Sequence, residues 1–210
     1  MMFHPALSEV YRYFHKGMTY VNDHHVYKFK DYSECIFETQ VQSKNWLGER
    51  LRGVCEHNKL EIKEIDIAAS WYGIVLVPFL RFYLDNVNIK FNLYDVDWYT
   101  TEISRHIFED EDTVTVHTND VVFDDIEFKG DTFINCSCEH MFDMKELTQQ
   151  NKDKLFVFQS NDNRNVQWMH INCVDTPEEL ARQAGIRRIY DQGVRNILRN
   201  NRIMVIGRVE

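Results

Sequence analysis

The sequence predicts an α/β fold: a doubly wound, mostly parallel, Rossmann-like sheet with helices on both faces and an N-terminal helical extension. From residue 60 onward, short apolar runs alternate with longer segments, which is the pattern of parallel strands joined by helical crossovers. Runs such as 154–160 (KLFVFQS) and 202–209 (RIMVIGRV) are apolar at successive positions, as expected of strands covered on both faces. We therefore expect a helical extension over 1–59 and a Rossmann-like domain over 60–210.

Composition narrows the class of protein. The 210 residues are 44% hydrophobic and 13% aromatic, which is enough to form a core. The longest uninterrupted apolar run, 74–80, is far shorter than the roughly 20 residues that span a bilayer, and the N-terminus lacks the pattern of a signal peptide. We expect no membrane contact. Five cysteines without dense spacing fit a reducing cytoplasmic compartment.

The N-terminal extension is predicted from the spacing of its apolar residues. These recur three and four apart over 5–16 and again over 41–57, so each segment is expected to be a helix with one apolar face. The polar stretch at 22–25 is expected to be a surface connection. Because the extension is rich in Tyr, Phe, His and Trp, it is a candidate surface for a protein partner or for a second copy of the chain.

The remaining elements follow from apolar runs and capping signals. Pro78 lies inside the helix expected over 72–84, so that helix either begins late or is kinked. Thr176 as N-cap and Pro177 at the first helical position predict a short helix over 177–184. The strands are expected at 62–69, 89–95, 113–118, 132–138, 155–160, 168–174 and 202–209, and a further helix at 98–108.

Charge is distributed unevenly along the chain. The net charge of −9 argues against a surface that binds extended nucleic acid. Seven arginines and one acid lie between 182 and 208. This basic segment either binds a phosphate or an acidic partner, or forms the solvated face of a helix.

Polar and acidic side chains gather where the expected strands end, which is where ligands bind in open α/β sheets. Asp95 ends the second strand, where a carboxylate can accept hydrogen bonds from both hydroxyls of a ribose. Asp120 follows the third strand and is placed to accept from the exocyclic amine of an adenine. Both acids also suit the caps of the helices that follow, so this alternative stays open.

In this order, the segments DIAASWYG, LYDVDW, HTND, INCSCEHM, FVFQSND and MVIGRV resemble class I S-adenosylmethionine-dependent methyltransferases. More narrowly, they resemble the small methyltransferase-like proteins of tailed phages. The resemblance covers roughly 45–210 and implies S-adenosylmethionine as a small-molecule cofactor. It implies that the first loop, formed by Ala69, Ser70, Trp71, Tyr72 and Gly73, surrounds the methionine part of the cofactor, that Asp95 binds the ribose, and that Asn119 and Asp120 contact the adenine.

The segment after the fourth strand is the candidate catalytic segment, since by the resemblance it faces the methyl group and the acceptor. Methyl transfer from a sulfonium is an in-line displacement, so the enzyme supplies orientation and, where needed, a base. Glu139 and His140 are candidate bases, Asn135 lies beside them, and Cys138 can be a nucleophile only if a neighbouring charge lowers its pKa. Alternatively, Glu139 and His140 cap a helix and Cys138 is simply buried.

No metal is expected. Cys136, Cys138 and His140 alternate along the chain, and His170 and Cys173 follow later, whereas structural zinc sites favour pairs on tight turns such as C-x-x-C.

Two functions of different classes remain. The first is methyl transfer to an unidentified acceptor, or cleavage of the cofactor without transfer. Motifs of the common nucleobase methyltransferases are absent from the sequence. The second is an inactive binding or structural module, because Ala68 and Ala69 replace the glycines usual in the first loop, where alanine does not readily adopt a positive φ. An open pocket beside Asp95 would favour the enzyme.

Overall fold

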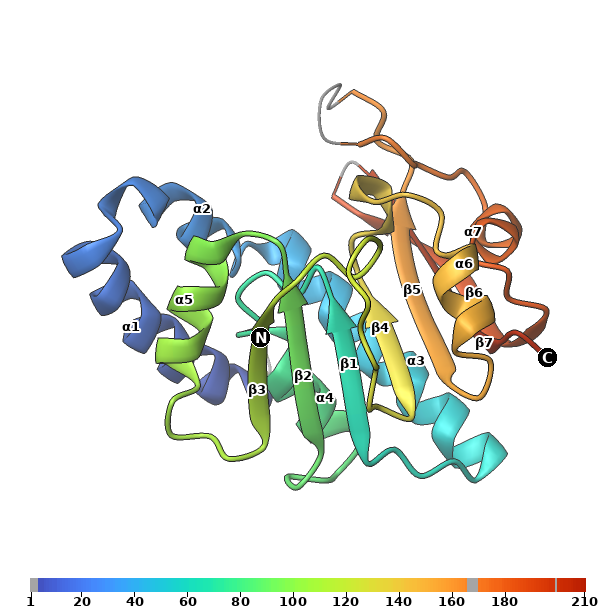
Figure 1. The fold of residues 1–210 in the computed structure, drawn as a ribbon, viewed down its shortest axis with the longest axis horizontal. Coiled ribbons are helices and arrows are strands. Elements are labelled where there is room, and N and C mark those ends of the chain that lie inside the picture. Colours follow the sequence, from blue (N-terminus) through green and yellow to red (C-terminus); the bar gives the residue numbers. More distant parts are fainter. Residues whose placement is uncertain (1–3, 166–169, 199) are drawn as a thin grey trace.

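The computed structural model describes residues 4–165, 170–198 and 200–210. Its centre is a seven-stranded sheet in the order β3-β2-β1-β4-β5-β7-β6 (Figure 1). Strands β1 to β5 are parallel to one another, and β7 runs antiparallel between β5 and β6. The predicted mostly parallel, Rossmann-like fold is confirmed. The strands are β1 Glu64–Ala68, β2 Lys90–Asp95, β3 Val114–Thr118, β4 Thr132–Asn135, β5 Leu155–Asn161, β6 Arg188–Ile197 and β7 Asn200–Arg208.

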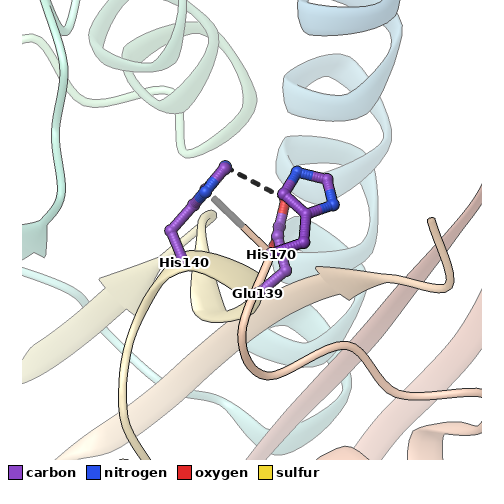
Figure 2. A group of neighbouring side chains, drawn as sticks. All are labelled: Glu139, His140 and His170. Atoms are coloured by element: carbon purple, nitrogen blue, oxygen red, sulfur yellow. Dashed lines mark ion pairs between the residues drawn. The ribbon is translucent and has the colours of Figure 1, made fainter. Parts of the chain in front are cut away.

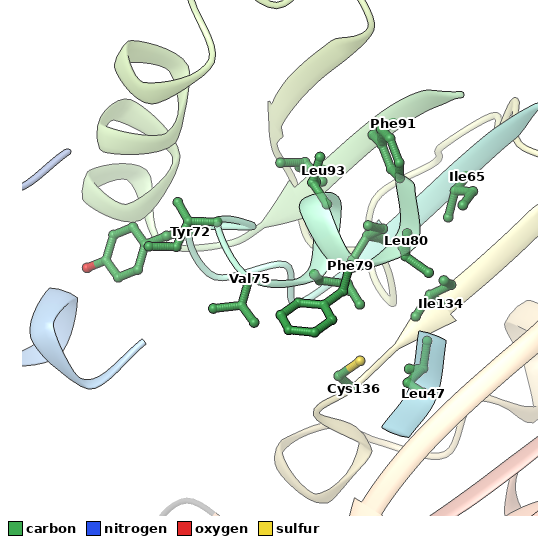
Figure 3. Packing of buried hydrophobic residues seen from close by; sticks show 14 of the residues in the cluster. Leu47, Ile65, Tyr72, Val75, Phe79, Leu80, Phe91, Leu93, Ile134 and Cys136 are labelled. Atoms are coloured by element: carbon green, nitrogen blue, oxygen red, sulfur yellow. The ribbon is translucent and has the colours of Figure 1, made fainter. Parts of the chain in front are cut away.

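Helices cover both faces of this sheet (Figure 1). Side chains alternate along each strand, so Ile65 and Ile67 of β1 pack into a core with α3 and α4 (Figure 3). Phe156 and Phe158 of β5 pack on the opposite face with residues of α6 and α7. The helices are α1 Ala6–His24, α2 Phe29–Glu34, α3 Glu38–Asn58, α4 Leu76–Tyr83, α5 Trp98–Ile107, α6 Lys145–Gln150 and α7 Pro177–Gln183, with short 3₁₀ helices η1 Val26–Lys28 and η2 Cys138–His140.

The N-terminal helices belong to the core of the protein. Helix α1 packs on α4 and α5, and α3 packs on α4 and on β6 and β7. Tyr32 of α2 is fully buried and donates hydrogen bonds to the backbone carbonyls of Tyr13 and Phe14 at 3.2 and 3.1 Å. The segment 22–25 was expected to be a surface connection, but α1 continues through it as far as His24. Helix α2 was not predicted.

The sixth strand was placed wrongly. Residues 168 and 169 lie outside the described residues, and 170–174 form no strand. The sixth strand of the chain is instead β6, which lies within the basic segment 182–208. Most of this segment is therefore a hairpin of β6 and β7 and not a helix face. Pattern reasoning missed β6 because it is an edge strand with mostly exposed or half-exposed side chains, and so carries no apolar run.

The expectations drawn from Pro78 and Thr176 are confirmed, whereas the end of the fourth strand was placed wrongly. Pro78 is the third residue of α4, so this helix begins late, as one of the two expectations had it. Thr176 caps α7 by accepting a hydrogen bond from the N–H of Glu179 at 3.1 Å. The fourth strand ends three residues earlier than expected, at Asn135, because the chain turns into η2.

Within the described ranges, no helix is both long and apolar enough to cross a bilayer.

Candidate functional site

A cavity of about 590 Å³ opens at the carboxyl ends of the central strands, within the usual size range of small-molecule sites. It is lined by the loop after β1, the end of β2, the segment after β4, the ends of β5 and β7, and residues of α2 and α3. Strand order reverses between β1 and β4, so the cavity lies at the topological switch point where open α/β sheets bind ligands.

The loop after β1 adopts left-handed backbone conformations. Ala69 has φ +46° and Trp71 has φ +52°, although neither is glycine, and each such residue costs about 1–2 kcal/mol. Gly73 has φ +69°, and a Cβ atom there would lie 2.8 Å from Cδ1 of Leu93. The alanine that replaces a glycine therefore does not prevent the tight turn that brings the backbone to the cavity.

Asp95 holds this loop in place. Its Oδ2 accepts from the backbone N–H of Trp71 at 2.9 Å, and its Oδ1 accepts from the backbone N–H of Asp97 at 3.1 Å. A carboxylate has about four acceptor positions, so these two bonds leave a lone pair on each oxygen. Burial raises the pKa of Asp95 above its ordinary value, while the two backbone bonds oppose the shift.

Helix α2 closes one side of the cavity through Asp31. Its Oδ2 accepts from the hydroxyl of Tyr72 at 2.6 Å and from the indole N–H of Trp71 at 3.4 Å. Tyr72 is buried and meets the Tyr32 ring edge-on. The N-terminal extension thus supplies part of the cavity wall, which sequence reasoning did not anticipate.

The floor of the cavity contains a buried ion pair. Oε1 of Glu139 accepts from Arg202 at 2.7 Å and from the side-chain amide of Asn161 at 2.6 Å. Burial alone would raise the pKa of Glu139, but the Arg202 guanidinium holds it below its ordinary value. Glu139 is therefore an ionised carboxylate held by two donors, from β5 and β7.

Lys44 of α3 also lines the cavity. Its amine donates to Oε1 of Gln40 at 2.6 Å. Burial lowers the pKa of Lys44 to about 8, an effect that the nearby Arg202 charge reinforces. A lysine with such a pKa exchanges protons near neutral pH.

Sequence reasoning did not identify Lys44, Arg202, Asn161 or Asp31. One feature of the sequence could have identified Lys44: the polar pair Ser43–Lys44 lies on the face of α3 that also carries buried Leu47. Ser43 is 3% exposed, and its hydroxyl donates to Oε1 of Gln159 at 2.8 Å.

The cavity brings together most of the predicted site residues. The predicted site residues that line it are Ala69, Ser70, Trp71, Tyr72, Gly73, Asp95, Glu139 and His140.

Two predicted catalytic residues, Asn135 and Cys138, are fully described but do not line the cavity. Asn135 is buried; its Oδ1 accepts from the N–H of Ser137 at 2.8 Å, and its amide points to the sulfur of Met141 at 3.1 Å. Burial, followed by the charge of Glu139, raises the pKa of Cys138 well above its ordinary value. The condition for a nucleophilic thiolate is therefore not met in this structure.

Asn119 and Asp120 build the turn after β3 and are likewise not among the residues that line the cavity. Oδ1 of Asp120 accepts from the backbone N–H groups of Val122 and Phe123 at 2.9 and 3.3 Å. The side chain of Asn119 donates to Asp124 at 3.0 Å. Their adenine contact stays a prediction.

Comparison with known proteins supports the fold at low sequence identity. No protein-family model and no curated protein sequence matches the chain. An S-adenosylmethionine-dependent methyltransferase from Clostridium acetobutylicum ATCC 824 is similar in structure, with a TM-score of 0.59 and 12% identity over 88% of this chain and 98% of that one. The N-methyltransferase NodS from Bradyrhizobium japonicum WM9, in complex with S-adenosyl-L-homocysteine, gives 0.59 and 9% over 83% and 90%.

A third similar structure is an O-methyltransferase family protein from Burkholderia thailandensis, with a TM-score of 0.54 and 16% identity over 88% of this chain. The chain spans 60% of the length of that protein. At these identities the likeness concerns the fold, which is the fold of S-adenosylmethionine-dependent methyltransferases.

Proposed function

We propose that the protein is an S-adenosylmethionine-dependent methyltransferase whose cofactor lies in the cavity between the loop after β1 and the end of β2. The observation that carries this proposal is the open cavity beside Asp95. A protein that had lost its cofactor would be expected to fill this space with side chains, whereas here the aromatic residues Trp71 and Tyr72 form part of the wall and leave the cavity open. Tyr72 is buried against α2.

The donor and acceptor groups of the cavity fit the cofactor. The free acceptor positions of Asp95 suit the two hydroxyls of a ribose. The loop 69–73 brings its backbone to the cavity wall, as close contact with the methionine end of the cofactor requires. Bound there, the cofactor would supply an electrophilic methyl group on its sulfonium.

The opposite wall of the cavity is proposed to receive the methyl acceptor. Glu139 accepts hydrogen bonds from Arg202 and Asn161, and its pKa is lowered, so it is a weak base. We assign it the role of positioning the acceptor. His140 and Lys44 both line the cavity and are the candidates to take a proton from an oxygen or nitrogen acceptor. The phage-type assignment, the cytoplasmic location and the N-terminal helical extension over 1–59 remain parts of this proposal.

Isothermal titration of the purified protein with S-adenosylhomocysteine and with S-adenosylmethionine tests the proposal, with ATP as a nucleotide control. We expect micromolar binding of the two sulfur compounds and none of ATP. Absence of heat and of any thermal shift at millimolar ligand would overturn the proposal and favour an inactive structural module.

A further inference from the structure

One carboxylate and two imidazole side chains lie close together in the part of the cavity that we propose for the methyl acceptor. Glu139 and His140 come from η2, directly after β4, and His170 comes from the segment that follows β5 (Figure 2). One carboxylate oxygen of Glu139 and one ring nitrogen of each histidine lie within 4.8 Å of one another. All three residues line the cavity.

Within the described part of the chain, one of the two carboxylate oxygens of Glu139 has no donor. The residue is 3% exposed. Arg202 and Asn161 both donate to Oε1, whereas Oε2 is buried and has no hydrogen-bond partner among the described residues. A buried acceptor left unpaired costs about 1–3 kcal/mol, so a ligand that occupies Oε2 would remove that cost.

His170 is oriented as metal-binding histidines are. Its Nδ1 lies 2.6 Å from the backbone carbonyl oxygen of Asn163. A carbonyl can only accept, so Nδ1 carries the proton and Nε2 presents a lone pair. Ligating histidines usually donate their other ring N–H to a carbonyl or carboxylate in this way, which fixes the tautomer and the ring orientation.

His140 completes the set. Its Nε2 lies 3.9 Å from Oε1 of Glu139, and its ring meets the His170 ring edge-on with centroids 4.6 Å apart. Donor atoms of a tetrahedral zinc site with bonds of 2.0–2.1 Å lie about 3.4 Å apart. The donor atoms, which lie within 4.8 Å of one another, would therefore have to move closer, and exposed His140 and half-buried His170 are the side chains with room to move.

We propose that Glu139, His140 and His170 bind a divalent transition-metal ion. Two imidazoles and one carboxylate suit Zn²⁺ or Fe²⁺ and leave coordination positions open. Arg202 and Asn161 hold the carboxylate from the other side, as outer hydrogen-bond donors do in metal sites. This proposal departs from the sequence expectation of no metal, which weighed Cys136, Cys138, His140, His170 and Cys173 but not the carboxylate of Glu139.

The position of the site indicates what the ion does, and this step rests on the proposed function. Because all three residues line the cavity, an ion held by them would be placed to bind and polarise an oxygen of the methyl acceptor. With Nε2 of His140 on the metal, Lys44 is left as the proton acceptor in the cavity. The implied acceptor class is a molecule that offers a hydroxyl or a carboxylate to the ion.

Titration of the metal-free, tag-free protein with Zn²⁺ and with Co²⁺ tests the site in the absence of any cofactor. We expect one ion per chain, with visible absorption bands of protein-bound Co²⁺. His140→Ala and His170→Ala should each weaken binding at least tenfold, while His15→Ala, at an exposed histidine of α1, should leave it unchanged. Two histidine variants are used because either one alone can fail to fold.

Absence of stoichiometric binding, or equal affinity in the His140 and His170 variants and the wild type, would overturn the metal site. Titration of S-adenosylhomocysteine into the same samples separates the two proposals. A protein that binds the cofactor product but no metal retains the proposed function without the site, and the reverse result retains the site alone.

Discussion

The carboxylate of Asp95 and the backbone N–H of Trp71 lie 2.9 Å apart, and this hydrogen bond joins the end of β2 to the left-handed loop after β1. One residue thus has two functions in the cavity. It holds the loop in a strained conformation, and it lines the cavity in which we propose that the ribose binds.

Replacement of Asp95 by Ala is therefore expected to weaken binding of S-adenosylhomocysteine by more than tenfold, since it removes both the ribose acceptor and the loop anchor. Isothermal titration measures the effect. Asp125→Ala, at an exposed acid after β3, is the matched control and should bind as the wild type does. Unchanged affinity in Asp95→Ala would remove this residue from the site.

Ala69→Gly is expected to stabilise the protein by about 1 kcal/mol, because glycine adopts φ +46° without the Cβ clash of alanine. Urea denaturation measures the change. Ala68→Gly is the control: Ala68 is buried in β1, where glycine should instead destabilise by about 1 kcal/mol. A loss of stability in both variants would show that the left-handed loop is not strained.

Arg202→Met is expected to destabilise the protein by about 3 kcal/mol, because it leaves the Glu139 carboxylate buried without its charge partner. The double variant Glu139→Gln/Arg202→Met should recover part of this loss. Arg164→Met breaks the exposed pair with Asp175 and should cost less than about 1 kcal/mol. Equal effects of the two arginine substitutions in urea denaturation would contradict a buried ion pair.

The amine of Lys44 is expected to titrate near pH 8, because burial disfavours its charged form. The unfolded chain keeps this proton up to about 10.5, so Lys44 should contribute a rise in the free energy of unfolding between about pH 8 and 10.5, measured as the difference between the wild type and Lys44→Met. Carbon-13 NMR of reductively methylated lysines reports the midpoint, and Lys44→Met assigns the resonance and should abolish the rise. A midpoint near 10.5 would remove Lys44 as a proton acceptor.

The sequence by itself determined the α/β class and the first five strands. The buried strands β1, β2, β4 and β5 each contain apolar residues at successive positions, and the edge strand β3 alternates Val114 and Val116 with polar residues, so both patterns are visible in one dimension. It also placed Asp95 and the loop 69–73 correctly at the same end of the sheet, since the carboxyl ends of parallel strands share an edge. The cap at Thr176 was readable for the same reason: its chemistry involves residues only three apart.

Only the tertiary structure decided the rest. The edge strand β6 has a mostly polar, half-exposed sequence, so no periodicity distinguished it from a helix face. Glu139 meets Arg202, and His140 meets His170, across sequence separations that no local pattern encodes. Lys44 reaches the cavity because α3 packs across β6 and β7. These contacts arise from the packing of distant segments, so the charge and protonation of the cavity are properties of the folded chain and not of any one motif.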